Sequence, residues 1–534
     1  MISFYGRHAM ERNFQRTPVH HGKQAVRSSR GASSHQYNPA VILARPNTDE
    51  KSGGCYGMVF VYSGNFECEI EKDQFNQTRA IMGLSEAFFS YPLDEGETFV
   101  IPETVLTYSD QGFGRLSRNL HRCFRRHLCR GRYRDQVRPI LVNSWEADYF
   151  HFTGESICRL AKEAAGLGVE MLVLDDGWFG KRDDDNSSLG DWTVNEEKLG
   201  CTMGELIRRV NDLGLKFGIW IEPEMISEDS DLYRAHPDWA LKIPRRNPIR
   251  ARNQLVLDFS RKEIRDHVFD AICAVLDQGN VEYIKWDMNR SINDVYSWSG
   301  REHGRLLYDY VLGVYDFLER LIQRYPDMLI EGCCGGGGRF DAGMLYYAPQ
   351  IWCSDNTDAI DRLEIQYGTS FIYPASSIGA HVSAVPNHQT GRITPMRTRG
   401  IVAMAGTFGY ELDFGRLSED EKREVRLQVE AYHKYAPLIQ NGDYYRLTNP
   451  QTDEVGAWAF VSEDKKDVLI SAVMIRRHGN MTVNYIRLQG LAPEKIYRDE
   501  KTGKSYSGAA LMEAGIPLPI EEGEYLAYQM YLRQ

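Results

Sequence analysis

The chain has 534 residues, of which 42% are hydrophobic and 26% charged, a composition typical of a globular protein with more than one hydrophobic core. Its formal net charge of -11 argues against a surface for nucleic acid, because the phosphate backbone is bound by a positive field. We therefore expect two or three domains and no nucleic-acid partner.

The sequence carries no pattern for insertion into a membrane or transport across one. No apolar run approaches the length of a membrane span, and the first residues lack the apolar core of a signal peptide. The ten cysteines include no CxxC pair, so we predict neither a disulfide framework nor a structural zinc site. A cytoplasmic protein without a membrane partner is expected.

Residues 1–115 are predicted to form an N-terminal β-sandwich domain. Between Cys55 and Asp110, apolar and polar residues alternate with a period of two, and Gly, Pro and Asn separate the short runs. An arginine-rich stretch from Leu120 to Arg138 follows. We interpret it as a solvated helix, which makes residues 116–137 a helical linker.

Residues 138–440 alternate short apolar runs with longer amphipathic stretches, which predicts parallel strands joined by helices. An α/β fold of the (β/α)8 TIM barrel type fits this pattern better than a doubly wound sheet, because no GxGxxG motif follows the first strand. Residues 441–534 return to short alternating runs and are predicted to form a C-terminal antiparallel β-sandwich. The eight barrel strands are expected at 138–145, 170–178, 216–224, 254–260, 281–287, 328–333, 350–355 and 377–383.

Polar and aromatic residues concentrate at the ends of these strands. In a barrel of this type, the carboxyl ends of the strands and the loops that follow them form the site of chemistry. Tryptophans can stack on the apolar faces of a sugar while carboxylates and cations bind its hydroxyl groups, so the composition predicts a sugar pocket. The residues concerned are Trp145, Asp175, Asp176, Trp220, Glu222, Glu224, Arg252, Lys285, Asp287, Cys333, Asp355 and Asp358.

Other kinds of site have weaker support. The glycines Gly335–Gly338 lack the GK[ST] continuation of a phosphate-binding loop. His381 and His388 are isolated, and the loop Asp183–Asn186 lacks the ligand spacing of an EF-hand, so we interpret it as a solvated loop. We therefore expect no metal and no cofactor.

Two carboxylates remain as candidates for acid–base and nucleophilic chemistry at an anomeric carbon. Asp287 fits the nucleophile, because Lys285 and Arg290 beside it would stabilise the ionised carboxylate. Asp355 fits the acid, because Trp352 and Asp358 would raise its pKa and keep it protonated near neutral pH. Either aspartate alone could equally be a strand-end cap or half of an ion pair.

The sequence resembles bacterial α-galactosidases of glycoside hydrolase family 36. The resemblance runs along the whole predicted barrel and includes VLDDGWFG (173–180), WIEPEM (220–225), KWDMNR (285–290) and GCCGGGGRFD (332–341). It implies retaining hydrolysis of terminal α-galactosyl residues from oligosaccharides such as melibiose and raffinose, with Asp287 as nucleophile and Asp355 as acid/base. The motif places the acid before Asn-Thr-Asp, which favours Asp355 over Asp358. The galactose pocket is implied to consist of Asp175, Asp176, Trp220, Arg252, Lys285, Asn289, Cys333 and Gly335, with Trp145 nearby.

The resemblance also concerns domains and assembly. Family members carry a large N-terminal β-supersandwich, of which residues 1–115 would form only a part, and this would disfavour the homo-tetramer of relatives. Three alternatives stay open: an α-N-acetylgalactosaminidase, a galactosyl transferase, and a non-catalytic sugar-binding fragment. Hydrolysis of p-nitrophenyl α-galactoside separates the enzymes from the binding fragment.

Overall fold

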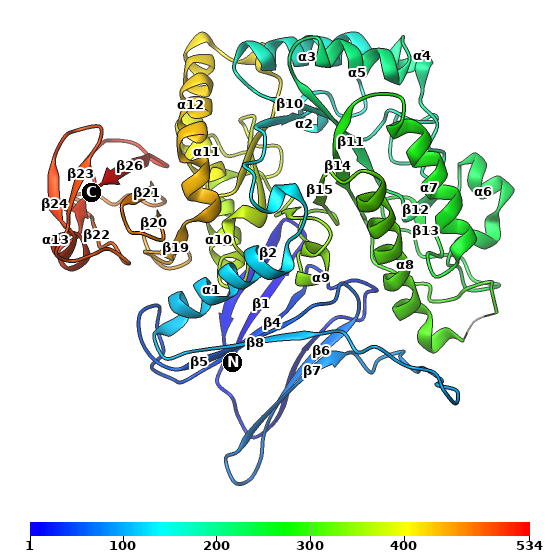
Figure 1. Cartoon of the computed structure of the whole chain (residues 1–534), viewed down its shortest axis with the longest axis horizontal. Helices are drawn as coiled ribbons and strands as arrows, with labels where there is room; N and C mark the ends of the chain where they lie inside the picture. The colour runs from blue at the N-terminus through cyan, green and yellow to red at the C-terminus, as the bar shows by residue number, and fades with distance from the viewer. Residues whose placement is uncertain (301) are drawn as a thin grey trace.

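The computed structural model describes residues 1–300 and 302–534. A closed barrel of eight parallel strands lies at its centre (Figure 1). Almost every position of these strands is buried, which explains their nearly continuous apolar sequence. The predicted barrel is confirmed. In chain order the strands are β9 (Leu141–Asn143), β10 (Met171–Leu174), β11 (Lys216–Ile221), β14 (Val281–Trp286), β15 (Leu329–Gly332), β16 (Gln350–Trp352), β17 (Ile378–Ser383) and β18 (Thr407–Glu411).

One predicted barrel strand is wrong and one was missed. The stretch 254–260 contributes only β13 (Gln254–Val256), which pairs antiparallel with β12 (Met225–Ser227) outside the barrel. The barrel closes instead through β18, which pairs with both β17 and β9. Asp287 therefore follows the fourth barrel strand and Asp355 the sixth, not the fifth and seventh.

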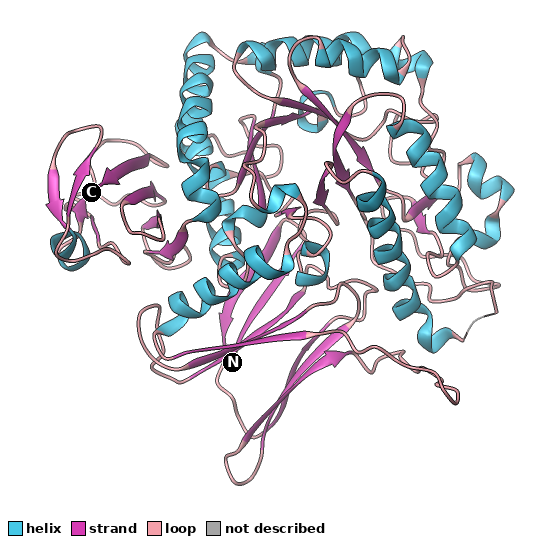
Figure 2. Ribbon diagram, in the orientation of Figure 1, coloured by secondary structure: helices cyan, strands magenta, loops and turns pink. Residues whose placement is uncertain are grey.

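Helices surround the barrel, as Figure 2 shows. Their start signals lie in the sequence: Thr153 and Ser418 each form a capping box, in which the side chain accepts a hydrogen bond from the third helical residue. The helices between and after the barrel strands are α2 (Trp145–Asp148), α3 (Gly154–Gly166), α4 (Glu196–Leu199), α5 (Met203–Asn211), α6 (Asp231–Ala235), α7 (Lys262–Leu276), α8 (His303–Arg324), α9 (Ala342–Leu345), α10 (Ala359–Thr369), α11 (Met396–Ala403) and α12 (Glu419–Asn441).

The N-terminal part of the chain forms two antiparallel sheets, of which the five-stranded one lies against the barrel through β2 and β5 (Figure 1). Buried side chains of β1 and β4 belong to the same hydrophobic core as those of the barrel strands. The five-stranded sheet has the order β2 (Met10–Arg16), β1 (Ile2–Arg7), β4 (Tyr37–Ala44), β5 (Cys55–Phe60) and β8 (Thr104–Ser109). The three-stranded sheet has the order β3 (Gly22–Arg27), β6 (Phe66–Lys72) and β7 (Thr78–Leu84).

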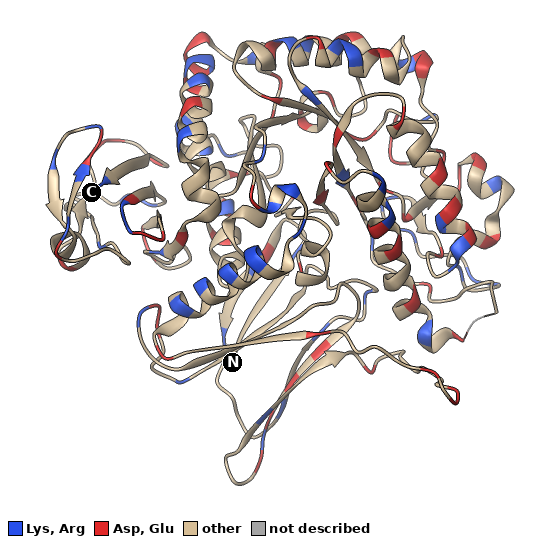
Figure 3. Cartoon of the chain, viewed as in Figure 1, with Lys and Arg blue, Asp and Glu red and all other residues tan. Residues whose placement is uncertain are grey.

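The arginine-rich stretch forms α1 (Gly112–Cys123), a π-helical turn (Phe124–Leu128) and a 3-10 turn (Arg132–Arg134). Figure 3 shows the basic residues along α1. The cations are less solvated than predicted: Arg122 pairs with Asp443 at 2.6 Å, and Arg125 donates to the carbonyl oxygen of Gly442 at 3.3 Å, both at the start of the C-terminal sheet. These cations therefore join segments more than three hundred residues apart.

The C-terminal part has a hydrophobic core of its own. Of the residues that the structure describes, no helix has the length and apolarity needed to span a bilayer. The main C-terminal sheet has six strands in the order β19 (Asp443–Arg446), β20 (Val455–Val461), β21 (Asp467–Met474), β26 (Ala527–Arg533), β23 (Ile496–Asp499) and β24 (Ser505–Ser507). Beside it lie the pair β22 (Tyr485–Ile486) and β25 (Ile516–Pro517), and α13 (Gly508–Glu513).

Candidate active site

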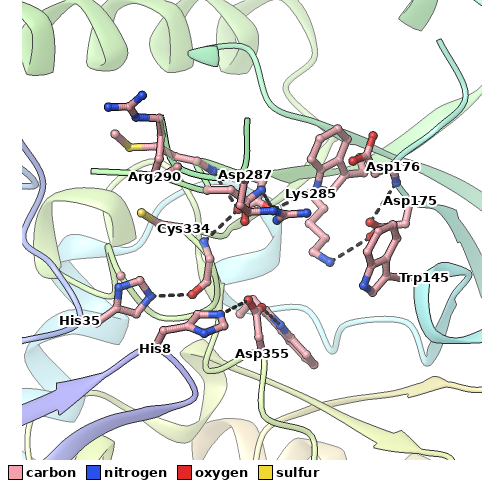
Figure 4. Close-up of a pocket in the computed structure, with 18 of the residues that line it drawn as sticks. His8, His35, Trp145, Asp175, Asp176, Lys285, Asp287, Arg290, Cys334 and Asp355 are labelled. Carbon is pink, nitrogen blue, oxygen red and sulfur yellow. Dashed lines mark hydrogen bonds and ion pairs between the residues drawn. The ribbon is translucent and has the colours of Figure 1, made fainter. Parts of the chain in front are cut away.

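A cavity of about 480 Å³ opens at the carboxyl ends of the barrel strands (Figure 4). Side chains from the strand ends form most of its wall, and the N-terminal segments around His8 and His35 complete it. The structure brings most of the predicted site residues together, but Glu222, Glu224, Cys333 and Asp358 do not line the cavity. Those that line the cavity are Trp145, Asp175, Asp176, Trp220, Arg252, Lys285, Asp287, Asn289, Gly335 and Asp355.

Asp287 is buried directly after β14, and four N–H groups donate to its carboxylate. The Trp220 indole donates to Oδ2 at 3.2 Å and the Asn289 amide at 2.8 Å. The backbone N–H groups of Met288 and Gly335 donate to Oδ1 at 2.8 and 3.1 Å. These four hydrogen bonds fix the orientation of the carboxylate, which lines the cavity.

The two cations predicted to flank Asp287 are placed differently. Lys285 donates to Asp175 at 2.9 Å and acts on Asp287 only through its charge. Burial would lower the pKa of Lys285, but the charge of Asp175 and other nearby acids raises it well above its usual value. Arg290 donates to the carbonyl oxygens of Ile249 and Gln254, both at 2.7 Å. The prediction that Arg290 supports Asp287 is wrong, because this guanidinium holds a neighbouring loop.

Asp355 follows β16 and faces the same cavity. Its Oδ1 accepts from the Trp352 indole at 3.1 Å, and its Oδ2 lies 2.8 Å from Nε2 of His8. Burial raises the pKa of Asp355, but the hydrogen bond and charge of His8, with the charges of Lys285 and Arg252, outweigh it and lower the pKa. The prediction of a raised pKa is therefore wrong, because it considered only neighbours in sequence.

Asp358 is a structural residue outside the cavity lining. Its Oδ1 caps α10 by accepting from the backbone N–H groups of Ile360 and Asp361 at 2.9 and 3.0 Å. Its carboxylate also pairs with Arg392 and accepts from Thr390 at 2.7 Å. Both carboxylate oxygens are thus engaged within the protein, and the residue serves the start of α10.

The glycine run after β15 lies between the two carboxylates. Gly335 donates its N–H to Asp287, and both Gly335 and Gly336 have positive φ, at 49° and 76°. A Cβ at Gly336 would lie 2.7 Å from the backbone nitrogen of Asp355. Only glycine permits this close approach of the two strand ends. Cys333 is buried behind the run, and burial together with the charge of Asp287 raises the pKa of its thiol well above the usual value.

The other predicted pocket residues are anchored by ion pairs. Asp175 accepts from Asn143 at 2.7 Å as well as from Lys285. Asp176 pairs with the buried Arg182 at 2.9 Å, and burial, only partly offset by this cation, raises its pKa. Arg252, in a positive-φ conformation, pairs with Asp185 at 3.0 Å. The acidic loop predicted to be solvated thus orients one cation of the cavity wall.

Sequence reasoning missed several residues of the cavity. His8 contacts Asp355, and Nε2 of His35 lies 2.6 Å from the carbonyl oxygen of Gly335. Both histidines come from loops of the N-terminal sheet, three hundred residues or more before their partners. No local pattern could reveal these contacts, because they depend on how the sheet docks on the barrel. The other missed lining residues include Glu146, His388, Gln389 and Glu411.

The chemistry that this arrangement can support is that of two carboxylates. One is surrounded by N–H donors and the other shares a hydrogen bond with a titratable histidine, both at the mouth of one barrel. The described residues contain no group of three or more His, Cys, Asp and Glu side chains that could hold a metal ion. Nucleophilic attack with acid–base assistance needs no more than these two carboxylates.

Comparison with known proteins gives matches over the residues of the barrel and over the residues before and after it in the chain. Family models match residues 1–94 (glycosyl hydrolase family 36 N-terminal domain), 98–442 (melibiase) and 455–532 (glycosyl hydrolase family 36 C-terminal domain). The chain is 64% identical to the bifunctional alpha-galactosidase/sucrose kinase AgaSK of Mediterraneibacter gnavus, over 99% of this chain and 56% of that protein. It is 48% identical to the alpha-galactosidase AgaA of Geobacillus stearothermophilus, over 100% of this chain and 73% of that one.

The solved structures agree with the sequence matches. The crystal structure of AgaA superposes with a TM-score of 0.98, covering 100% of this chain and 74% of the other. A variant of AgaA with raffinose bound superposes with the same TM-score at 47% identity. The chain thus spans little more than half of the length of AgaSK and about three quarters of that of AgaA.

Proposed function

This chain belongs to glycosyl hydrolase family 36, and we propose that it is an α-galactosidase. In this proposal it hydrolyses terminal, non-reducing α-D-galactosyl residues of oligosaccharides such as melibiose and raffinose. The observation that carries the proposal is the Asp287 carboxylate, oriented by four N–H donors into a cavity that Asp355 also faces. The relatives named alpha-galactosidase and the raffinose complex of AgaA support the substrate class.

In the first step Asp287 attacks the anomeric carbon while Asp355 gives a proton to the leaving oxygen. The N–H donors hold the Asp287 carboxylate in position before the attack, so the nucleophile needs no reorganisation. In the second step Asp355 takes a proton from the water that attacks the same carbon. Because two displacements occur at one carbon, the released galactose keeps the α configuration.

Galactose recognition is assigned to the carboxylates and cations of the cavity wall. Asp175 and Asp176 can accept hydrogen bonds from sugar hydroxyl groups, and Lys285 and Arg252 can donate. The ion pairs that hold these groups fix their positions before the sugar arrives, which allows an axial O4 to be favoured over its epimer. Trp145 supplies an apolar face at the edge of the cavity.

The decisive experiment is turnover of p-nitrophenyl α-D-galactoside by the expressed chain. Asp287→Asn keeps the shape of the side chain but removes the nucleophile, so kcat should fall at least about 10³-fold. The matched control is Asp212→Asn, which changes an exposed carboxylate at the end of α5 and should leave kcat unchanged. Binding of galactose without turnover by the wild type, or equal activity in both variants, would overturn the proposal.

Retention of the anomeric configuration is tested separately, by NMR of the galactose that is released first. We expect α-galactose to appear first and to convert to the β anomer by mutarotation. Early β-galactose would point to inversion through a single displacement. The oligomeric state and the cytoplasmic location stay predictions; light scattering measures the former against the 61.2 kDa of a single chain.

A further inference from the structure

We propose that His8 is a positioning residue that shares the catalytic proton with Asp355, so that a His–Asp pair serves as acid/base. This inference rests on the proposed function, because it deepens the role of the same carboxylate. His8 lies in the turn between β1 and β2, and its Nε2 is 2.8 Å from Oδ2 of Asp355. Figure 4 shows the imidazole pointing at this carboxylate across the cavity mouth.

The hairpin that carries His8 is anchored on the barrel. Arg12 is buried, and its guanidinium donates to the Thr369 hydroxyl at 2.8 Å and to the Gly337 carbonyl oxygen at 3.0 Å. The same group lies 4.7 Å from the centroid of the Phe340 ring. These contacts join β2 to the glycine run and to α10, so the position of His8 follows from the docking of the hairpin.

A second histidine limits the orientation of the first. The rings of His8 and His35 meet edge to face, with centroids 5.6 Å apart and planes at 85°. His35 is itself held by the carbonyl oxygen of Gly335, whose N–H group donates to Asp287. Loops of the N-terminal sheet therefore contact both candidate catalytic carboxylates, one directly and the other through the single residue Gly335.

Charges around the pair favour a single shared proton. The hydrogen bond with Asp355 raises the pKa of His8, burial opposes it, and the charges of Asp355 and Glu11 raise it further, while Arg252 lowers it. Burial raises the pKa of Asp355, but the hydrogen bond and charge of His8 and the charges of Lys285 and Arg252 lower it. At a pH between the lowered pKa of Asp355 and the raised pKa of His8, the pair holds one proton, and the two groups titrate as a unit. Because the His8 side chain is 57% exposed, this proton exchanges readily with water.

The His8–Asp355 pair gives up one proton in the first step of the reaction and takes one back in the second. In the free enzyme the pair carries one proton, which moves to the glycosidic oxygen as the C1–O bond breaks and the bond from Asp287 to C1 forms. This leaves neutral His8 beside ionised Asp355. In the second step the water oxygen attacks C1, the bond to Asp287 breaks, and the proton of the water returns to the pair.

A shared proton changes the pH dependence of turnover. If Asp355 acted alone, the alkaline limb of kcat/KM would follow the pKa of its carboxyl group. If the pair acts, this limb follows the loss of the last shared proton, at a pH above the usual histidine pKa of about 6.5. For melibiose, whose leaving group needs a proton, His8→Gln should therefore move the alkaline limb to lower pH by more than about one unit. For 2,4-dinitrophenyl α-galactoside, which leaves without a proton, the profile should stay unmoved.

His20→Gln is the control, because His20 is an exposed histidine of the same N-terminal segment, hydrogen-bonded only locally to the carbonyl oxygen of His21. It should leave both profiles unchanged. An unmoved alkaline limb for melibiose in His8→Gln would overturn the inference. An equal loss with both substrates at every pH would also overturn it, because this is the pattern of a purely structural role.

A second measurement needs no turnover. In protein labelled with ¹³C at Cε1 of histidine, the His8 resonance is identified by its loss in His8→Gln. It should titrate above about pH 6.5 in the wild type and at lower pH in Asp355→Asn. Equal titration in both proteins would refute the pairing. An inactive wild type with this coupling intact would refute the proposed function while leaving the pairing in place, so the two failures are distinguishable.

Discussion

At the scale of single residues, the cavity wall depends on buried charges that neutralise each other. Lys285 and Asp175 are both almost fully buried, and their charged groups lie 2.9 Å apart. A buried pair of this kind adds little net stability, but each member needs the other, because an unpaired buried charge is strongly unfavourable. The pair therefore sets the shape of the sugar pocket and makes it sensitive to substitution.

We expect Lys285→Met to lower the free energy of unfolding by about 3–5 kcal/mol and to reduce activity, because Asp175 is left buried without its cation. Lys262→Met is the matched control, since its exposed pair with Asp266 on α7 should contribute no more than about 0.5 kcal/mol. Urea unfolding of both variants measures the difference. Similar losses in the two variants would contradict the assignment of a buried, dependent pair.

At the scale of elements, the contact between β2 and α10 brings the N-terminal hairpin to the cavity. The helix approaches the strand so closely that a Cβ at Gly368 would lie 1.8 Å from the carbonyl oxygen of Arg12. This glycine lies inside a helix, where alanine is otherwise preferred. Its absence of a side chain is therefore a packing requirement, and it permits the approach that carries His8 to Asp355.

Gly368→Ala should lower the stability by about 1–3 kcal/mol, because the added methyl group forces strand and helix apart. It should also weaken hydrolysis of melibiose, since the hairpin would move His8. Gly166→Ala in α3 is the control: a Cβ there meets no atom within 4 Å, so a gain of up to about 1 kcal/mol is expected from helix propensity. Thermal unfolding compares the two, and a gain in both would disprove the close contact.

At the scale of the whole molecule, the N-terminal sheets and the barrel share one core, and Asp341 lies where they meet. Its carboxylate caps α9 and accepts from the hydroxyl groups of Ser33 and Ser63 at 2.6 and 2.7 Å. Burial raises the pKa of Asp341 to about 6, although these bonds act in the opposite direction. A titratable group thus links the docking of the sheets to pH.

The sign of this linkage follows from the raised value. Between the unfolded pKa of 3.8 and the folded value of about 6, the folded state binds the proton more tightly, so stability falls as pH rises through this window. Relative to Asp341→Asn, which cannot ionise, the wild type should lose about 2.4 kcal/mol between pH 4 and pH 7. Urea unfolding of both proteins at the two pH values measures this, and a constant difference would contradict it.

The sequence by itself determined the elements and the residues that end them. Buried parallel strands read as apolar runs, so the barrel and the strand ends carrying Asp287 and Asp355 could be predicted from periodicity alone. The local sequence pattern did not predict which strands join the barrel, because this depends on the strands they pair with. The run 254–260 resembles a barrel strand but pairs with β12, whereas the short β18, with its Gly and Thr, becomes a barrel strand through its two neighbours. The division into domains at 115, 137 and 440 stays a prediction.

Only the tertiary structure decided the partners of the two carboxylates. Asp287 takes its donors from the ends of β11 and β14 and from a glycine turn, and Asp355 takes His8 from a hairpin 347 residues earlier in the chain. Protonation depends on all charges within a few ångströms, and distance in space is independent of distance along the chain once the sheets have docked. For this reason the positions of Asp287 and Asp355 at two barrel strand ends could be predicted from sequence, while the direction of the pKa shift of Asp355 could not.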